Sequence, residues 1–119
     1  MADGLGDFQK FRADLNEEIL ACGHLGIKRF FALDHQAYDS GALDTKTKEL
    51  LGLVASMVLR CDDCITYHLL RAGEVGWSRD EVIDALNVAL VVSGSIAIPH
   101  VRRAFAKMRD IPGLQPEVK

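Results

Sequence analysis

The spacing of apolar residues is the feature that most limits how this 119-residue chain can fold, because they recur every three or four positions along most of it. This spacing gathers side chains on one face of an α-helix, whereas a half-buried strand alternates apolar and polar residues. β-Branched residues do not alternate with polar ones here, and the hairpin dipeptide Asn-Gly is absent. The pattern therefore predicts an all-α fold, a single-domain bundle of about six helices covering residues 1–119.

Helix ends can be placed from capping residues and breakers. Asp44 is a good N-cap for a third helix, and Ser78 followed by Glu81 forms the capping-box pattern that opens a fifth. Pro99 suits the first turn of the last helix, and residues 112–116 are expected to form a frayed tail. The other predicted helices cover residues 8–22, residues 26–38 and a segment with two cysteines that ends near residue 73 or 76; the fifth covers 79–92 and the last 99–109.

Composition and charge exclude several classes of function. Hydrophobic residues make up 49% of the chain, and they surround the predicted helix 79–92 almost completely, so we expect that helix to be buried centrally or between subunits. The net charge is −3 without a basic patch, which argues against nucleic acid as a partner. The longest uncharged stretch, residues 85–99, is shorter than the ~20 residues of a membrane span. With no signal-peptide pattern at the N-terminus, a cytoplasmic protein that does not enter a membrane is predicted.

The stretch Cys61-Asp62-Asp63-Cys64-Ile65-Thr66-Tyr67-His68 carries the clearest chemical signal. On a helix, Cys61, Cys64 and His68 share one face, which brings the imidazole within reach of the second sulfur. A neighbouring base or a helix N-terminus favours the reactive thiolate, and a second thiol can trap an oxidised first one as a disulfide. The spacing therefore predicts dithiol redox chemistry at a helix N-terminus.

Two other interpretations of these cysteines stay open. They could be buried, inert side chains, which free cysteines often are, and Cys22 on the first helix is best explained as core packing. Alternatively, Cys61, Cys64 and His68 could bind zinc, with Cys22 or His24 as a fourth ligand, although Cys22-Gly23-His24 has no standard ligand spacing.

Glu49 is a further candidate with two possible placements. It could lie at the surface near a helix start, where the helix dipole favours a carboxylate. It could instead turn toward His68, orient the imidazole and accept a proton, as the third member of a triad does. Residue spacing alone does not choose between these placements.

The spacing of Glu49, Cys61, Cys64 and His68, an E-x11-CxxCxxxH pattern, resembles that of the alkylhydroperoxidase D-like, or carboxymuconolactone decarboxylase, family. The resemblance runs from residues 43–50 through the cysteine motif to residues 94–100 and so covers most of the chain. The constellation itself is specific, whereas the flanking helices are much less so.

The resemblance implies an all-α, cofactor-free thiol peroxidase. By position, Cys64 would attack the peroxide and become a sulfenic acid, Cys61 would resolve it to a disulfide, and His68 with Glu49 would form the proton relay. A separate thiol or disulfide electron donor would reopen the disulfide, and a homotrimer or homohexamer is expected. The alternatives are a non-redox decarboxylase-type enzyme acting on a small lactone or acid, and a zinc-stabilised binding module.

The sequence does not determine how three residues in or near the motif affect the cysteines. Asp62 and Asp63 disfavour a neighbouring thiolate by charge, yet at a helix N-terminus they are favourable capping residues. His100 lies where family members often have histidine, and we expect it to line the same pocket.

Overall fold

The computed structural model describes residues 2–117, and these residues form helices and turns but no strand, which confirms the all-α prediction. The ends of the predicted domain, residue 1 and residues 118–119, lie outside the described residues. The helices are α1 (Ala2–Ala21), α2 (Leu25–Ala37), α3 (Thr45–Leu59), α4 (Asp62–Glu74), α5 (Arg79–Ser93) and α6 (Ile98–Met108), and the short 3-10 helix η1 (Ser95–Ala97) precedes α6.

The predicted capping residues begin their helices. The Asp44 carboxylate accepts a hydrogen bond of 2.8 Å from the backbone N–H of Thr47 at the start of α3. At α5, the Ser78 hydroxyl accepts from the Glu81 N–H at 3.2 Å, and the Glu81 carboxylate accepts from the Ser78 N–H at 2.9 Å. Both interactions satisfy amide groups that a helix N-terminus leaves unpaired, which explains why these helices begin where the sequence predicts.

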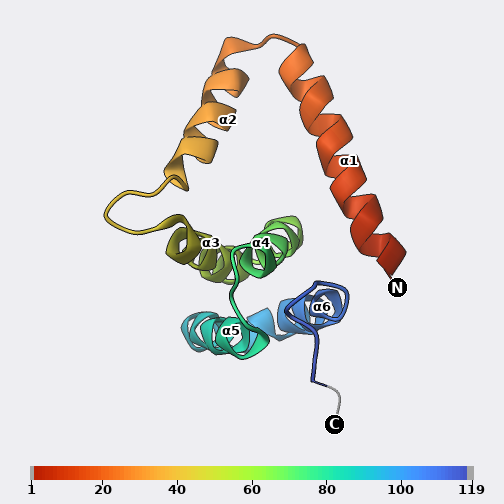
Figure 1. The fold of residues 1–119 in the computed structure, drawn as a ribbon, viewed down its shortest axis with the longest axis vertical. Coiled ribbons are helices and arrows are strands. Elements are labelled where there is room, and N and C mark those ends of the chain that lie inside the picture. The colour runs from red at the N-terminus through yellow and green to blue at the C-terminus, as the bar shows by residue number, and fades with distance from the viewer. Residues whose placement is uncertain (1, 118–119) are drawn as a thin grey trace.

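Helices α3 to α6 form the body of the protein. Helix α3 packs on α4 and α5, and α4 also packs on α6, so α3 and α4 lie side by side in the layer of the body that faces the arm (Figure 1). Large apolar side chains without solvent exposure fill the space between these helices; they include Leu53, Met57, Leu69 and Met108. The pair α3–α4, which carries the predicted site, is therefore held by the main core.

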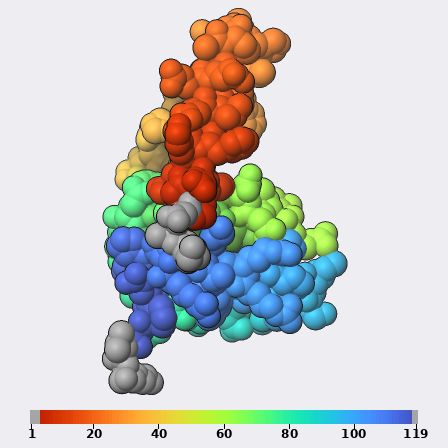
Figure 2. Space-filling view, turned by 90° about the vertical axis from the view of Figure 1, so that its right-hand side faces the viewer, coloured from red at the N-terminus to blue at the C-terminus, as the bar shows by residue number. Residues whose placement is uncertain are grey.

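Helices α1 and α2 form an arm that projects from this body as a V (Figures 1 and 2). The radius of gyration is 15.0 Å, larger than the roughly 13.5 Å expected for a compact domain of this length. No residue of α2 is buried, and Phe11, Phe30 and Leu33 are 67%, 66% and 65% exposed. The arm therefore presents apolar side chains that this chain alone does not cover.

The C-terminal segment differs from the prediction of a frayed tail. Ile111 and Leu114 are 1% and 0% exposed, and the Arg79 guanidinium donates a hydrogen bond of 3.0 Å to the backbone carbonyl of Leu114. Gly73 allows this packing, because a Cβ added there would lie 2.9 Å from the Ile111 side chain. The prediction was wrong up to Leu114, since these apolar side chains return to the core after α6 ends.

Two burial predictions also fail in the single chain. Val88, Val91 and Val92 on α5 are 56%, 77% and 68% exposed, so α5 is not central; its burial between subunits stays a prediction. Cys22 is exposed and is not paired with another cysteine, so the prediction that it packs in the core is wrong. The reason is that α1 ends in the arm, away from the core. None of the described helices combines the length and apolar character needed to cross a membrane.

Candidate active site

The cysteine pair lies where α3 ends and α4 begins. Arg60 closes α3 in a left-handed conformation with φ 58°, and Cys61 follows at once as the N-cap of α4. Cys61 and Cys64 form a disulfide, and the Cys61 sulfur accepts a hydrogen bond of 3.2 Å from the Cys64 N–H. Cys64 is exposed. Unpaired N–H groups and the helix dipole favour negative charge here, so this position stabilises a thiolate when the disulfide is reduced.

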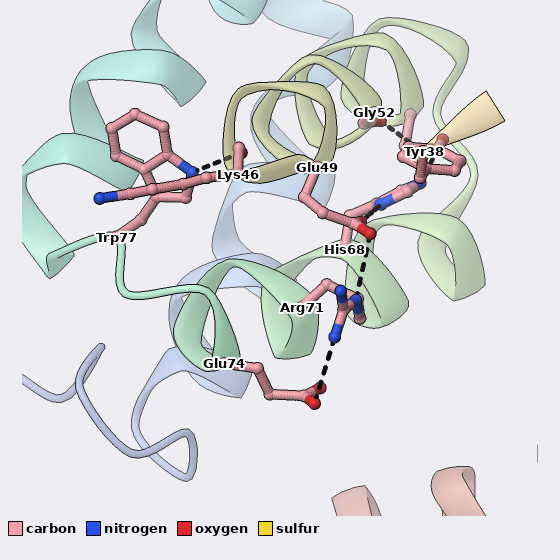
Figure 3. A network of polar contacts seen from close by, with 9 residues as sticks. Tyr38, Lys46, Glu49, Gly52, His68, Arg71, Glu74 and Trp77 are labelled. Carbon is pink, nitrogen blue, oxygen red and sulfur yellow. Dashed lines mark hydrogen bonds and ion pairs between the residues drawn. The ribbon is translucent and has the colours of Figure 1, made fainter. Parts of the chain in front are cut away.

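Glu49 and His68 form a buried pair (Figure 3), and His68 follows Cys64 by about one turn of α4. Glu49 projects from α3 and His68 from α4, with 3.0 Å between a carboxylate oxygen and the imidazole Nδ1. Their side chains are only 3% and 9% exposed. The second Glu49 oxygen accepts a hydrogen bond of 3.1 Å from Arg71 Nε. Of the two placements predicted for Glu49, the structure shows the inward one.

Tyr38 completes the hydrogen bonds of His68. Its hydroxyl lies 3.3 Å from Nε2 of the imidazole, on the side opposite Glu49. Because Nδ1–H donates to the Glu49 carboxylate, Nε2 carries the lone pair and accepts from the Tyr38 hydroxyl. Burial lowers the pKa of His68 against the opposing effect of Glu49, and burial together with nearby carboxylates raises the pKa of Tyr38. At neutral pH the arrangement is therefore a neutral imidazole between a protonated phenol and a carboxylate.

Sequence reasoning missed Tyr38 as a site residue. It is the C-cap of α2 and lies 30 positions before His68, so no helical spacing connects the two. One local signal is Gly52 on α3: a Cβ there would lie 2.8 Å from His68 Nε2 and 2.9 Å from the Tyr38 hydroxyl. A glycine inside an apolar helix can mark such a close approach, but it does not identify the approaching side chains.

A pocket of about 380 Å³ opens between the arm and α4. Cys64, His68 and Tyr38 all contribute to its lining. Its apolar side comes from α1, with Phe8, Phe11, Leu15 and Ile19. An exposed sulfur, a buried base and a partly apolar surface thus meet in one cavity, which is the arrangement that a nucleophilic thiol needs to meet a small organic substrate.

A second histidine–carboxylate pair lies on the other side of the motif. His100 Nδ1 is 2.7 Å from one Asp62 oxygen, and Arg103 donates to the other oxygen at 3.4 Å. His100 does not line the pocket beside Cys64, contrary to our expectation. This pairing bears on whether Asp62 disfavours a thiolate, because His100 and Arg103 bind its carboxylate and so reduce the effect of its negative charge on the cysteines.

The ligands considered for zinc are separated in the structure. His24 is the N-cap of α2, and its Nδ1 accepts a hydrogen bond of 3.3 Å from the Ile27 N–H. Throughout residues 2–117, no group of three or more His, Cys, Asp or Glu side chains is arranged to hold a metal ion.

Comparison with known proteins identifies the family of the chain. The chain belongs to the carboxymuconolactone decarboxylase family, whose model matches residues 27–107. It is 31% identical over 84 residues to uncharacterized protein 4 in the cox locus of Paracoccus denitrificans, covering 71% of this chain and 76% of that protein.

Solved structures show the same fold. A crystal structure of a Thermotoga maritima protein superposes with a TM-score of 0.82 at 57% identity and covers 85% of this chain and 89% of that one. A second, with a TM-score of 0.81 at 56% identity, covers 85% and 86% and is of a carboxymuconolactone decarboxylase family protein named for a possible part in an antioxidative response. A Legionella pneumophila member of the family, with a TM-score of 0.69 at 24% identity over 87% of this chain and 89% of its own, supports the fold alone.

Proposed function

We propose that this protein is a thiol-dependent peroxide reductase that uses Cys61 and Cys64 as a dithiol–disulfide couple. The observation that carries the proposal is the disulfide at the start of α4, with the exposed Cys64 sharing a pocket with the buried His68–Glu49 pair. The antioxidative name of the Thermotoga protein points to the same class of chemistry.

The oxidative half-reaction begins with the reduced protein. The Cys64 thiolate attacks one oxygen of the hydroperoxide, so that a sulfur–oxygen bond forms and the oxygen–oxygen bond breaks. The leaving alkoxide takes the proton that His68 holds and departs as the alcohol, and Cys64 is left as a sulfenic acid. Glu49 stabilises the imidazolium while His68 holds this proton, and the Arg71 guanidinium keeps the carboxylate in position.

The disulfide closes in the second step. The Cys61 thiol attacks the Cys64 sulfur and loses its proton, hydroxide leaves Cys64, and the two combine as water. An external dithiol donor then supplies two electrons and two protons, which restores both thiols and leaves the donor as a disulfide. None of these steps needs a metal or an organic cofactor.

The lining of the pocket favours an organic hydroperoxide as the substrate. Its apolar side, from Phe8, Phe11, Leu15 and Ile19, can bury an alkyl or aryl group, which hydrogen peroxide lacks. We also propose that copies of this chain assemble as a homotrimer or homohexamer in the cytoplasm, without nucleic-acid or membrane partners. The exposed apolar residues of the arm and of α5 support such an assembly.

A thiol titration tests the proposal. Reduced protein receives one equivalent of cumene hydroperoxide, and free thiols are counted before and after. Two thiols per chain should disappear together and return with a dithiol reductant. Cys64→Ser should abolish turnover, whereas Cys22→Ser, which removes the exposed cysteine outside the pocket, should leave the rate unchanged.

Full peroxide turnover by Cys64→Ser would overturn the assigned role of Cys64. Unreactive thiols, together with activity on a small lactone that survives loss of Cys61 and Cys64, would replace the proposal with a decarboxylase-type reaction.

A further inference from the structure

We propose that the Tyr38 hydroxyl carries the proton from the Cys64 thiol to His68 and then donates a hydrogen bond to the thiolate. The inference rests on the proposed function, because it concerns how the attacking thiol is ionised. It would make Tyr38, which comes from the arm, a proton-relay residue alongside the motif residues of α3 and α4.

The Tyr38 hydroxyl occupies the basic nitrogen of His68. Nδ1 is engaged by Glu49 at 3.0 Å and Nε2 by the Tyr38 hydroxyl at 3.3 Å (Figure 3). In the described part of the chain, neither His68 nor Tyr38 is hydrogen-bonded to a sulfur of the disulfide. The Tyr38 hydroxyl occupies the lone pair of His68 and Tyr38 lines the pocket together with Cys64, so in the reduced protein a proton that leaves Cys64 is proposed to reach His68 through the phenol.

Tyr38 also contributes to both cavities around the relay. It lines the pocket that contains Cys64, and it lines a neighbouring cavity of about 560 Å³ to which Glu49 and Arg71 contribute. A tyrosine hydroxyl can accept one hydrogen bond while it donates another, so a single group in this position can link thiol and imidazole.

Gly52 gives independent evidence that the contact is built into the fold. A Cβ at this position would lie 2.6 Å from the imidazole Cε1 and 2.9 Å from the Tyr38 hydroxyl. These distances are too short for an unshifted side chain, so the Tyr38–His68 pair fits against α3 only because residue 52 is a glycine.

Ionisation of Cys64 through Tyr38 moves two protons. The S–H bond of Cys64 breaks and its proton binds the Tyr38 oxygen, while the original phenolic proton moves to His68 Nε2. The products are a thiolate, a neutral tyrosine and an imidazolium paired with Glu49. Tyr38 now donates its hydrogen bond to the thiolate, so the hydroxyl stabilises the ionised form that it helped to create.

Titratable groups face the relay from four helices. The guanidinium of Arg12 comes from α1, the carboxylates of Asp34 and Glu49 from α2 and α3, and Tyr67 and Arg71 from α4; Asp63 also lines the pocket. Burial, Asp34 and Glu49 all raise the pKa of Tyr38, which keeps the phenol protonated at neutral pH. A neutral phenol can pass a proton on, whereas a phenolate would compete with the thiolate for it.

Alkylation of a single thiol gives the sharpest test, because it measures thiolate formation without requiring peroxide turnover. Cys22→Ser and Cys61→Ser together leave Cys64 as the one thiol of the chain. Its rate of reaction with iodoacetamide is measured from pH 5 to 10 in this background, with and without Tyr38→Phe. We expect the midpoint of the profile to rise by about one pH unit, which slows alkylation about tenfold below the midpoint, while the plateau at high pH stays the same.

Tyr67→Phe is the comparison variant, because it removes the other tyrosine hydroxyl that lines the pocket. The Tyr67 ring packs edge-on against His68 with 5.1 Å between centroids, but His68 donates its hydrogen bond to Glu49 and accepts one from Tyr38. We expect the midpoint to shift less in Tyr67→Phe than in Tyr38→Phe.

Three results would overturn the inference: an unchanged midpoint in Tyr38→Phe, an equal shift in Tyr67→Phe, or a fall of the high-pH plateau, which would mean that Tyr38 only shapes access to the sulfur. A shifted midpoint in a protein that fails to reduce peroxide would keep the relay and reject the proposed function, so the two failures are distinguishable.

Discussion

Two histidine–carboxylate–arginine groups flank the Cys61–Cys64 disulfide, and they have the same connectivity. In the first, Glu49 accepts from His68 Nδ1 with one oxygen and from Arg71 with the other. In the second, Asp62 binds His100 Nδ1 and Arg103 in the same way. The groups differ in burial: the Glu49 side chain is 3% exposed and the Asp62 side chain is 45% exposed.

Burial gives the two groups different physical properties. In the low dielectric around Glu49, charge interactions are strong, and an unpaired partner is costly. Around Asp62, water screens the same interactions and can replace any partner that is lost. Because of this difference in burial, we expect the first group to serve the proposed proton relay and the second to act only as a local surface pair.

The two groups should differ first in peroxide reduction. Glu49→Gln keeps the size of the side chain but removes the charge that stabilises the His68 imidazolium, and we expect the second-order rate constant with cumene hydroperoxide to fall about 100-fold. Asp62→Asn, its counterpart in the exposed group, should change the rate by less than about threefold. Stopped-flow thiol oxidation of the reduced proteins measures both. Equal losses in the two variants would show that burial does not distinguish the groups.

Stability should separate the groups next. Glu49→Ala leaves the buried His68 and the Arg71 guanidinium without their shared acceptor, and we expect the free energy of unfolding to fall by about 3–5 kcal/mol. Asp62→Ala removes an exposed pair and a favourable charge in the first turn of α4, with an expected cost of about 1 kcal/mol or less. Urea denaturation of the reduced proteins measures both values. A cost for Asp62→Ala close to that of Glu49→Ala would contradict the comparison.

The part of this site that local sequence determines could be predicted. The capping residues Asp44 and Ser78 set helix starts through contacts three residues away, and the CxxC spacing placed Cys64 in the first turn of α4. His68 lies one turn after Cys64 on the same helix, so helical geometry also predicts that the two side chains are close.

The parts that depend on packing between distant segments could not be predicted. Tyr38 reaches His68 across 30 positions, and Asp62 reaches His100 across 38, and no periodicity encodes either contact. The same limit explains the errors. An apolar stripe on α1 predicts burial but does not identify the surface that buries it, which explains the wrong prediction for Cys22. A segment rich in proline and glycine predicts fraying, yet Leu114 in that segment is buried.

The smallest expected effect is the pH dependence of stability. Burial lowers the pKa of His68 in the folded protein below the value of about 6.5 for an unfolded histidine. As pH falls through this window, the unfolded chain takes up a proton that the folded protein does not, so the free energy of unfolding decreases, by at most about 1.4 kcal/mol per pH unit for one group. The decrease begins near pH 6.5 and stops once the pH is below the folded pKa. Denaturation midpoints between pH 7.5 and 5 should therefore depend less on pH in His68→Gln than in the parent. A parent slope retained in His68→Gln would place the proton-linked group outside the buried pair.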